Sequence, residues 1–82
     1  MHILTAYLNS LDTREQQDFA RRCNTSVGYL RKAVCNGQRL GEILCLHIDT
    51  HSSGKVSCES LRPDIDWSLL LNWAKRRLEK QV

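Results

Sequence analysis

Apolar residues recur along this chain at the three- and four-residue spacing of amphipathic helices, and no stretch alternates with the two-residue period of a strand. The pattern predicts an all-α fold with four or five helices. The first helix covers residues 2–9 and has one expected buried stripe, which continues into the following turn. That stripe consists of Ile3, Leu4, Tyr7, Leu8 and Leu11.

The second and third helices are short and joined by a tight turn. The second begins at residue 12 or 13, because the run DTREQ offers a capping oxygen followed three residues later by an acid or amide. Asn24 tolerates left-handed backbone geometry and can turn the chain without a glycine. Thr25 and Ser26 then offer a cap for the third helix, which ends at the Asn-Gly pair of residues 36–37. The expected inward faces are Phe19, Ala20 and Cys23 on the second helix, and Val27, Leu30, Ala33 and Val34 on the third.

These two helices match the helix-turn-helix pattern. Ala20 stands where the helices would cross, and Val27 with Leu30 would pack the third helix onto the second. The outward face of the third helix would then form a ridge sized for the major groove of DNA. Gly28 lies near the start of this helix, where it costs about 1 kcal/mol relative to Ala. The loss is explained if the backbone must approach bases or phosphates closely at that point.

The second half of the chain adds further helical segments. A fourth helix is predicted over residues 40–49, and a short helical turn capped by Ser57 runs to Leu61. Pro63 keeps Arg62 out of helical geometry, so a new element begins after it. The closing helix runs from Trp67 to about residue 81. The apolar residues expected to face inward from the fourth helix are Leu40, Ile43, Leu44 and Ile48.

The closing helix carries apolar residues on two faces. At 100° per residue, one stripe contains Trp67, Leu70, Leu71, Ala74 and Leu78, while Leu69 and Trp73 fall nearly opposite. A helix on a small core can bury only one face on its own domain, so the other should pack on a partner chain in a dimer or larger assembly. We therefore predict two units, a DNA-binding domain over residues 1–66 and an oligomerisation element over residues 67–82. The expected oligomerisation residues are Trp67, Leu69, Leu70 and Trp73.

Charge is distributed unevenly in a chain whose net charge is +3. Residues 13–39 carry a net charge of +4, residues 42–66 a net charge of −3, and residues 67–82 a net charge of +3. A basic segment beside an acidic one is typical of a surface that meets a polyanion with one face only.

The runs DFARRCNTSVGYLRKAVCNG and GKVSCESLRPDIDW resemble the Cro-like phage and prophage regulators, particularly the YdaS-like group of antitoxins. The resemblance covers residues 3–69 and implies a small five-helix-type helix-turn-helix domain, here followed by a C-terminal amphipathic helix. It also implies a transcriptional repressor that binds a palindromic operator in double-stranded DNA as a dimer. The chain departs from the family in having Asn24 where glycine is common, and in continuing past LRPDIDW into a full basic helix.

The resemblance also implies which residues meet DNA. Residues 24–25 form the turn. The base-facing positions are Ser26, Val27, Gly28, Arg31 and Lys32, and the positions facing the DNA backbone are Gln16, Gln17, Tyr29 and Arg39. The competing hypothesis is an antitoxin that acts by binding a toxin, or a second regulator, with DNA binding secondary.

Other functional classes find little support in the sequence. Zinc's preferred ligand types occur at Cys45, His47, His51 and Cys58, but their spacing is poor for a metal site. No nucleophile has a histidine and an acid in a recognisable motif, so we expect neither an enzyme nor a cofactor. No apolar run approaches the roughly 18 residues of a membrane helix. Without an export signal, we expect a cytoplasmic protein with four free thiols.

Overall fold

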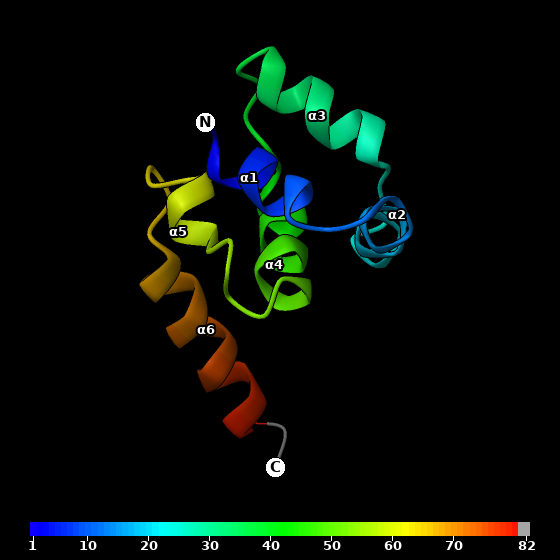
Figure 1. The fold of residues 1–82 in the computed structure, drawn as a ribbon. Coiled ribbons are helices and arrows are strands. Elements are labelled where there is room, and N and C mark those ends of the chain that lie inside the picture. Colours follow the sequence, from blue (N-terminus) through cyan, green and yellow to red (C-terminus); the bar gives the residue numbers. More distant parts are fainter. Residues whose placement is uncertain (81–82) are drawn as a thin grey trace.

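The computed structural model describes residues 1–80, with side chains to residue 78, and consists of helices joined by short loops (Figure 1). These are α1 (Ile3–Asn9), α2 (Thr13–Arg22), α3 (Val27–Cys35), α4 (Glu42–His51), α5 (Cys58–Leu61) and α6 (Trp67–Lys80). The described residues contain no strand, so the predicted all-α fold class is confirmed. The end of the last helix, expected near residue 81, lies outside the described residues.

The helix starts use the caps that the sequence predicted. At α2, Asp12 Oδ1 accepts the Glu15 N–H at 2.8 Å, while Glu15 Oε1 accepts the Asp12 N–H at 3.1 Å, which completes a capping box. At α3, Ser26 Oγ accepts the Tyr29 N–H at 3.1 Å. Between the two helices Asn24 adopts a φ of 60°, the left-handed turn expected of it.

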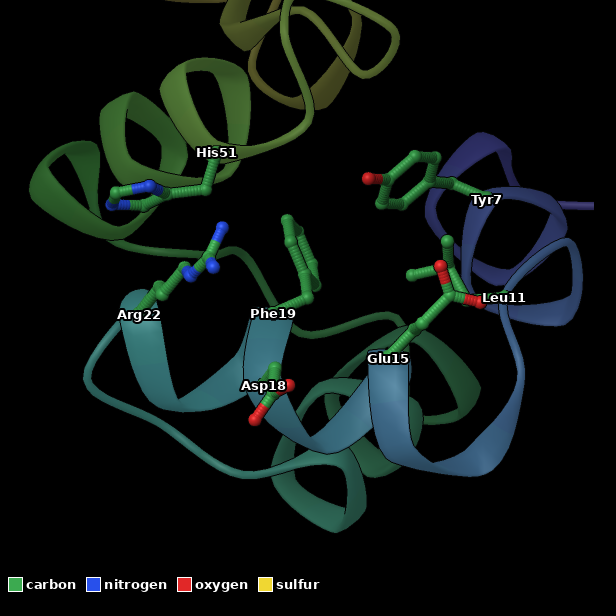
Figure 2. Close-up of a pocket in the computed structure, with 7 residues that line it drawn as sticks. All are labelled: Tyr7, Leu11, Glu15, Asp18, Phe19, Arg22 and His51. Carbon is green, nitrogen blue, oxygen red and sulfur yellow. The ribbon is translucent and has the colours of Figure 1, made fainter.

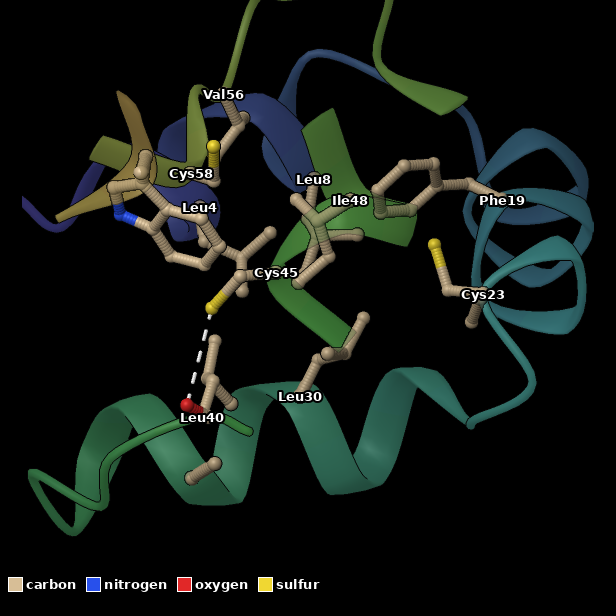
Figure 3. Close-up of a cluster of buried hydrophobic side chains, with 13 residues drawn as sticks. Leu4, Leu8, Phe19, Cys23, Leu30, Leu40, Cys45, Ile48, Val56 and Cys58 are labelled. Atoms are coloured by element: carbon tan, nitrogen blue, oxygen red, sulfur yellow. Dashed lines mark hydrogen bonds between the residues drawn. The ribbon is translucent and has the colours of Figure 1, made fainter. Parts of the chain in front are cut away.

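One core lies between α1, α2, α3, α4 and the segment around α5 (Figure 3). Leu4 and Leu8 of α1, Leu30 of α3 and Ile48 of α4 meet in it, and each is fully buried. Fully burying a leucine or isoleucine side chain contributes about 1.5–3 kcal/mol. This shared core fixes α3 against the rest of the domain, so its outer face is held by a rigid support.

In the stripes predicted for the first and fourth helices, two residues are exposed instead of buried. Ile3 is 40% exposed, and Ile43 is 68% exposed. The fourth helix was predicted to begin at residue 40 with Leu40 on the same face as Ile43, whereas α4 begins at Glu42 and Leu40 is buried from the preceding loop. At 100° per residue, Ile43 lies about 140° around α4 from the fully buried Ile48.

The loop before α6 is held by the side chain of Arg62. Its Nη1 donates to the Leu40 carbonyl at 2.8 Å, and its Nε and Nη2 donate to the Asp64 carboxylate at 2.9 and 2.8 Å. The Trp67 indole Nε1–H donates to the Arg62 carbonyl at 2.9 Å. Hydrogen bonds from Arg62 lower the pKa of Asp64 to about 2. These contacts give the LRPDIDW run a structural role, since they join the loop before α4, the end of α5 and the start of α6.

Helix α6 extends away from the other helices, and α3 lies at the opposite end of the molecule (Figure 1). Trp67 is 7% exposed and belongs to the core, so its assignment to the oligomerisation surface is corrected. Beyond Trp67, the apolar side chains of both faces are exposed: Leu69, Leu70, Leu71, Trp73 and Leu78. The expectation that one face of this helix packs on its own domain is therefore wrong after the first turn, because the helix leaves the body there.

Candidate nucleic-acid interface

Helices α2 and α3 are joined by a turn with well-defined backbone contacts. The Thr25 N–H donates to the Ala20 carbonyl at 3.0 Å, and the Asn24 N–H donates to the Arg21 carbonyl at 3.0 Å. Ala20 is 1% exposed and Leu30 is fully buried, as expected at a close helix crossing. The helix-turn-helix pattern seen in the sequence thus corresponds to two packed helices with a tight turn.

The start of α3 and the neighbouring face of α2 form a depression of about 350 Å³. Among the predicted DNA-contacting residues, Gln17, Ser26, Val27 and Gly28 line it. Gly28 is exposed, and a Cβ atom placed on it would meet no heavy atom within 4 Å. Packing within the chain therefore does not require a glycine here.

A second depression lies at the same turn. It is open and is lined by Ser26 and Tyr29 together with Arg21, which was not among the predicted DNA-contacting residues. Tyr29 is 45% exposed, and its hydroxyl accepts a hydrogen bond from Gln38 Nε2 at 3.3 Å. The contiguous basic pair at residues 21–22 was a signal for Arg21, but only the fold shows that it lies beside Tyr29.

Arg31 and Gln16, predicted separately, lie next to each other. Arg31 Nη2 donates to Asn9 Oδ1 at 3.1 Å and approaches Gln16 Oε1 at 3.5 Å. Gln16 in turn donates through Nε2 to the Leu8 and Leu11 carbonyls at 2.8 and 3.1 Å. Asn9 was not predicted, and no local sequence signal identifies it, because it meets Arg31 across 22 residues of chain.

The remaining predicted cations are exposed. Lys32 lies on the exposed surface of α3. Arg39 follows the helix, its side chain is 78% exposed, and its Nη1 lies 3.8 Å from Asp64. An exposed pair at this distance contributes little to stability, about 0–1 kcal/mol. Arg39 thus remains available to an anion, although it lies beside the Asp64 carboxylate.

A pocket of about 200 Å³ lies among α1, α2 and the end of α4 (Figure 2). Phe19 and Tyr7 form its aromatic wall, with ring centroids 5.1 Å apart at 66°, and Arg22 and His51 lie on the opposite side. No predicted DNA-contacting residue lines this pocket.

The residues considered for zinc do not converge. Cys45 is fully buried, its Sγ lies 3.8 Å from the Leu40 carbonyl (Figure 3), and burial raises the pKa of its thiol. His47 and His51 stack with ring centroids 5.7 Å apart. Cys58 instead lies within a small group with Asp49 and Glu59, and burial, followed by a hydrogen bond to Asp49, raises the pKa of its thiol to about 11.

All four cysteines are free thiols, and three of them are buried. No helix in the described part of the chain has both the length and the apolar character needed to cross a membrane.

Comparison with known proteins found one similarity that bears on function. Over 62 residues the chain is 29% identical to the Escherichia coli K12 protein named "Prophage transcriptional regulatory protein". The aligned region covers 76% of this chain and 94% of that protein. No protein-family model matches the chain. No solved structure matches it either.

Proposed function

We propose that this protein is a sequence-specific DNA-binding transcriptional repressor of the Cro type, with α3 entering the major groove. The similarity to a prophage transcriptional regulator supports a regulatory role, and the relative matches along nearly its whole length. The arrangement of α2 and α3 supports the mode of binding, because a packed helix pair with an exposed second helix is the geometry that helix-turn-helix proteins use.

The observation that carries this proposal is the exposed start of α3. Gln17, Ser26, Val27 and Gly28 share one depression there, and Arg31 and Lys32 follow on the same helix. Gly28 has no side chain to hold DNA away from the backbone, and polar and basic side chains surround it. A surface of this kind can come close to base edges and phosphates. Nothing in the packing of the domain accounts for Gly28, so a requirement of the ligand is the better explanation.

Assembly through α6 completes the proposal. Leu69, Leu70 and Trp73 are 65%, 42% and 51% exposed, and several large exposed apolar side chains on one helix are typical of an interaction site. Because α6 and α3 lie at opposite ends of the molecule (Figure 1), a partner on α6 would leave α3 free. A symmetric pair of such chains would bind a palindromic operator with two recognition helices.

A footprint of the purified full-length chain on the DNA that flanks its own gene tests this function. We expect protection of a symmetric site whose half-sites lie one helical turn apart or a multiple of it. The variant Lys32→Ala should weaken the footprint, whereas Lys55→Ala, which removes a lysine in the loop before α5, should leave it unchanged. Failure of the wild-type chain to bind any duplex DNA would overturn the proposal.

The exposed apolar residues of α6 also support a second candidate function, that of an antitoxin, since they could bind a toxin instead of a second copy of this chain. Two results distinguish the functions. A purified chain that binds DNA without a partner supports the repressor, whereas a chain that binds only a co-expressed partner through α6 supports the antitoxin.

A further inference from the structure

The arginines of this domain differ in the groups that their guanidinium groups contact. Arg21, Arg39 and Arg62 each lie within 4.0 Å of a carboxylate. Arg31 has no carboxylate within that distance in the described part of the chain, and its hydrogen-bond partners are the neutral amide oxygens of Asn9 and Gln16. The Arg31 guanidinium is therefore positioned by hydrogen bonds while its charge is left uncompensated.

The support behind Arg31 is itself fixed. Gln16 is half-buried, and its Nε2 donates to two carbonyls at the end of α1 and in the turn after it, those of Leu8 and Leu11. With its nitrogen held in this way, Gln16 turns its Oε1 toward α3, where Arg31 approaches at 3.5 Å. Asn9, the last residue of α1, supplies the shorter contact at 3.1 Å.

We propose that Asn9 is a positioning residue of the DNA interface, which together with Gln16 holds the Arg31 guanidinium ready to contact a backbone phosphate. This inference rests on the proposed function. A long side chain normally loses rotamer freedom when it binds a ligand, and ordering it beforehand removes that cost. Because the two amides carry no charge, they order Arg31 without reducing its attraction to phosphate.

The geometry favours a phosphate over a guanine edge. A guanidinium can form two parallel hydrogen bonds either through Nη1 and Nη2 or through Nε and Nη2, so both forks use Nη2. Nη2 is the atom that meets Asn9 and Gln16. Each fork uses a different N–H of Nη2, and Asn9 and Gln16 together engage both. The Nε–H and the two N–H groups of Nη1 remain as separate donors that form no parallel pair, which suits phosphate oxygens, whereas the specific contact to guanine uses the fork.

The test uses the full-length chain and a short mixed-sequence DNA duplex, because a phosphate contact does not depend on sequence. Fluorescence anisotropy between about 50 and 200 mM salt gives both the affinity and the salt slope. Arg31→Ala should weaken binding and reduce the magnitude of the slope by about one. Asn9→Ala should weaken binding about 2- to 10-fold. When Arg31→Ala is already present, Asn9→Ala should have no further effect.

Asn9→Asp provides the sharper variant. It keeps an acceptor beside Arg31 but neutralises the guanidinium, so binding should fall further than in Asn9→Ala while circular dichroism shows an intact fold. Ser10→Asp adds the same charge one residue away and should weaken binding less. Asn72→Ala, on the exposed surface of α6, controls for removing an asparagine and should bind as the wild type does.

The outcomes separate this inference from the function on which it rests. A wild-type chain that binds no duplex overturns the proposed function itself. If the wild type binds and Asn9→Ala has equal effects with and without Arg31, the positioning role is wrong. If Arg31→Ala relaxes preference at one base pair of the footprinted site and leaves the salt slope unchanged, the phosphate assignment is wrong.

Discussion

The substitution Gly28→Glu separates folding of this domain from DNA binding. Gly28 is the second residue of α3, it is exposed, and a Cβ atom there would meet no heavy atom within 4 Å. Its φ is not in the left-handed region, because the glycines with positive φ are Gly37 and Gly54. A side chain at this position can therefore be accommodated without any movement of the fold.

The expected gain in stability follows from two terms. Replacing a helical glycine with a better helix former removes a cost of up to about 1 kcal/mol. The first turn of α3 contains no acidic residue, and a carboxylate there interacts favourably with the helix dipole, by about 0.3–1 kcal/mol. At about 4–8 °C per kcal/mol for a domain of this size, Tm should rise by roughly 4 °C or more.

DNA binding should change in the opposite direction. The new side chain adds bulk and negative charge at the proposed point of closest approach to DNA. Juxtaposing like charges in an interface costs several kcal/mol, which corresponds to a loss of affinity of about 100-fold or more. Stability and affinity would thus move apart in a single variant.

Thermal unfolding followed by circular dichroism and anisotropy on the footprinted site measure the two effects. Gly28→Ala, which adds a methyl group without charge, should show the gain in stability with a smaller loss of binding. Thr50→Glu adds the same charge on the exposed surface of α4, away from both α3 and α6, and should leave affinity nearly unchanged. A folded Gly28→Glu protein that binds the site as tightly as the wild type would refute the placement of α3 in the groove. A Tm below that of the wild type would refute the claim that a side chain fits at residue 28 without steric hindrance.

Three further predictions concern the rest of the molecule. Because hydrogen bonds from Arg62 hold the pKa of Asp64 at about 2, below its usual 3.8, their ion pair stabilises the fold above about pH 4. That contribution is lost as pH falls from about 4 to 2, so Asp64→Asn should lower Tm at pH 7 and weaken its dependence on pH in that range. The double variant Leu69→Lys with Trp73→Lys should lower the molar mass measured by light scattering, and an unchanged mass would exclude this surface from assembly. Cys35 is the exposed cysteine and should react first with a thiol reagent, whereas the buried thiols should react only after unfolding.

Local signals in the sequence were sufficient for the helix-turn-helix unit. A capping box, a left-handed asparagine and a serine cap act over three or four residues, and each has the geometry expected of it. The inward face of α3 was also predictable, because Leu30 and Ala33 follow the period of a single helix. Where the helix boundary was misplaced, at α4, the assigned face was wrong at Ile43.

The candidate site was only partly accessible to the same reasoning. The exposed polar and basic residues of the expected recognition helix could be identified from their positions in the sequence. Their contacts could not be identified in this way, because Arg31 meets Asn9 of α1 and Gln16 of α2. The role of Arg62 was likewise hidden, since its partner Leu40 lies 22 residues away in the chain.

The sequence by itself determined the helices, the caps of α2 and α3 and the inward face of α3, since these depend on backbone hydrogen bonds and side-chain periodicity within a few neighbouring residues. Tertiary structure alone decided that Arg31 meets Asn9 and Gln16, and where the last helix goes. Arg31 is held by neutral amides that come from two other helices, whereas Arg62 pairs with the Asp64 carboxylate two residues further along the chain. Helix α6 carries enough apolar residues to cover a core, yet only Trp67 is buried in one. The amphipathic pattern of α6 fixes which residues share a face. Burial of that face also requires another helix or loop to pack against it. After Pro63 the chain leads α6 away from the domain, so no other helix packs there.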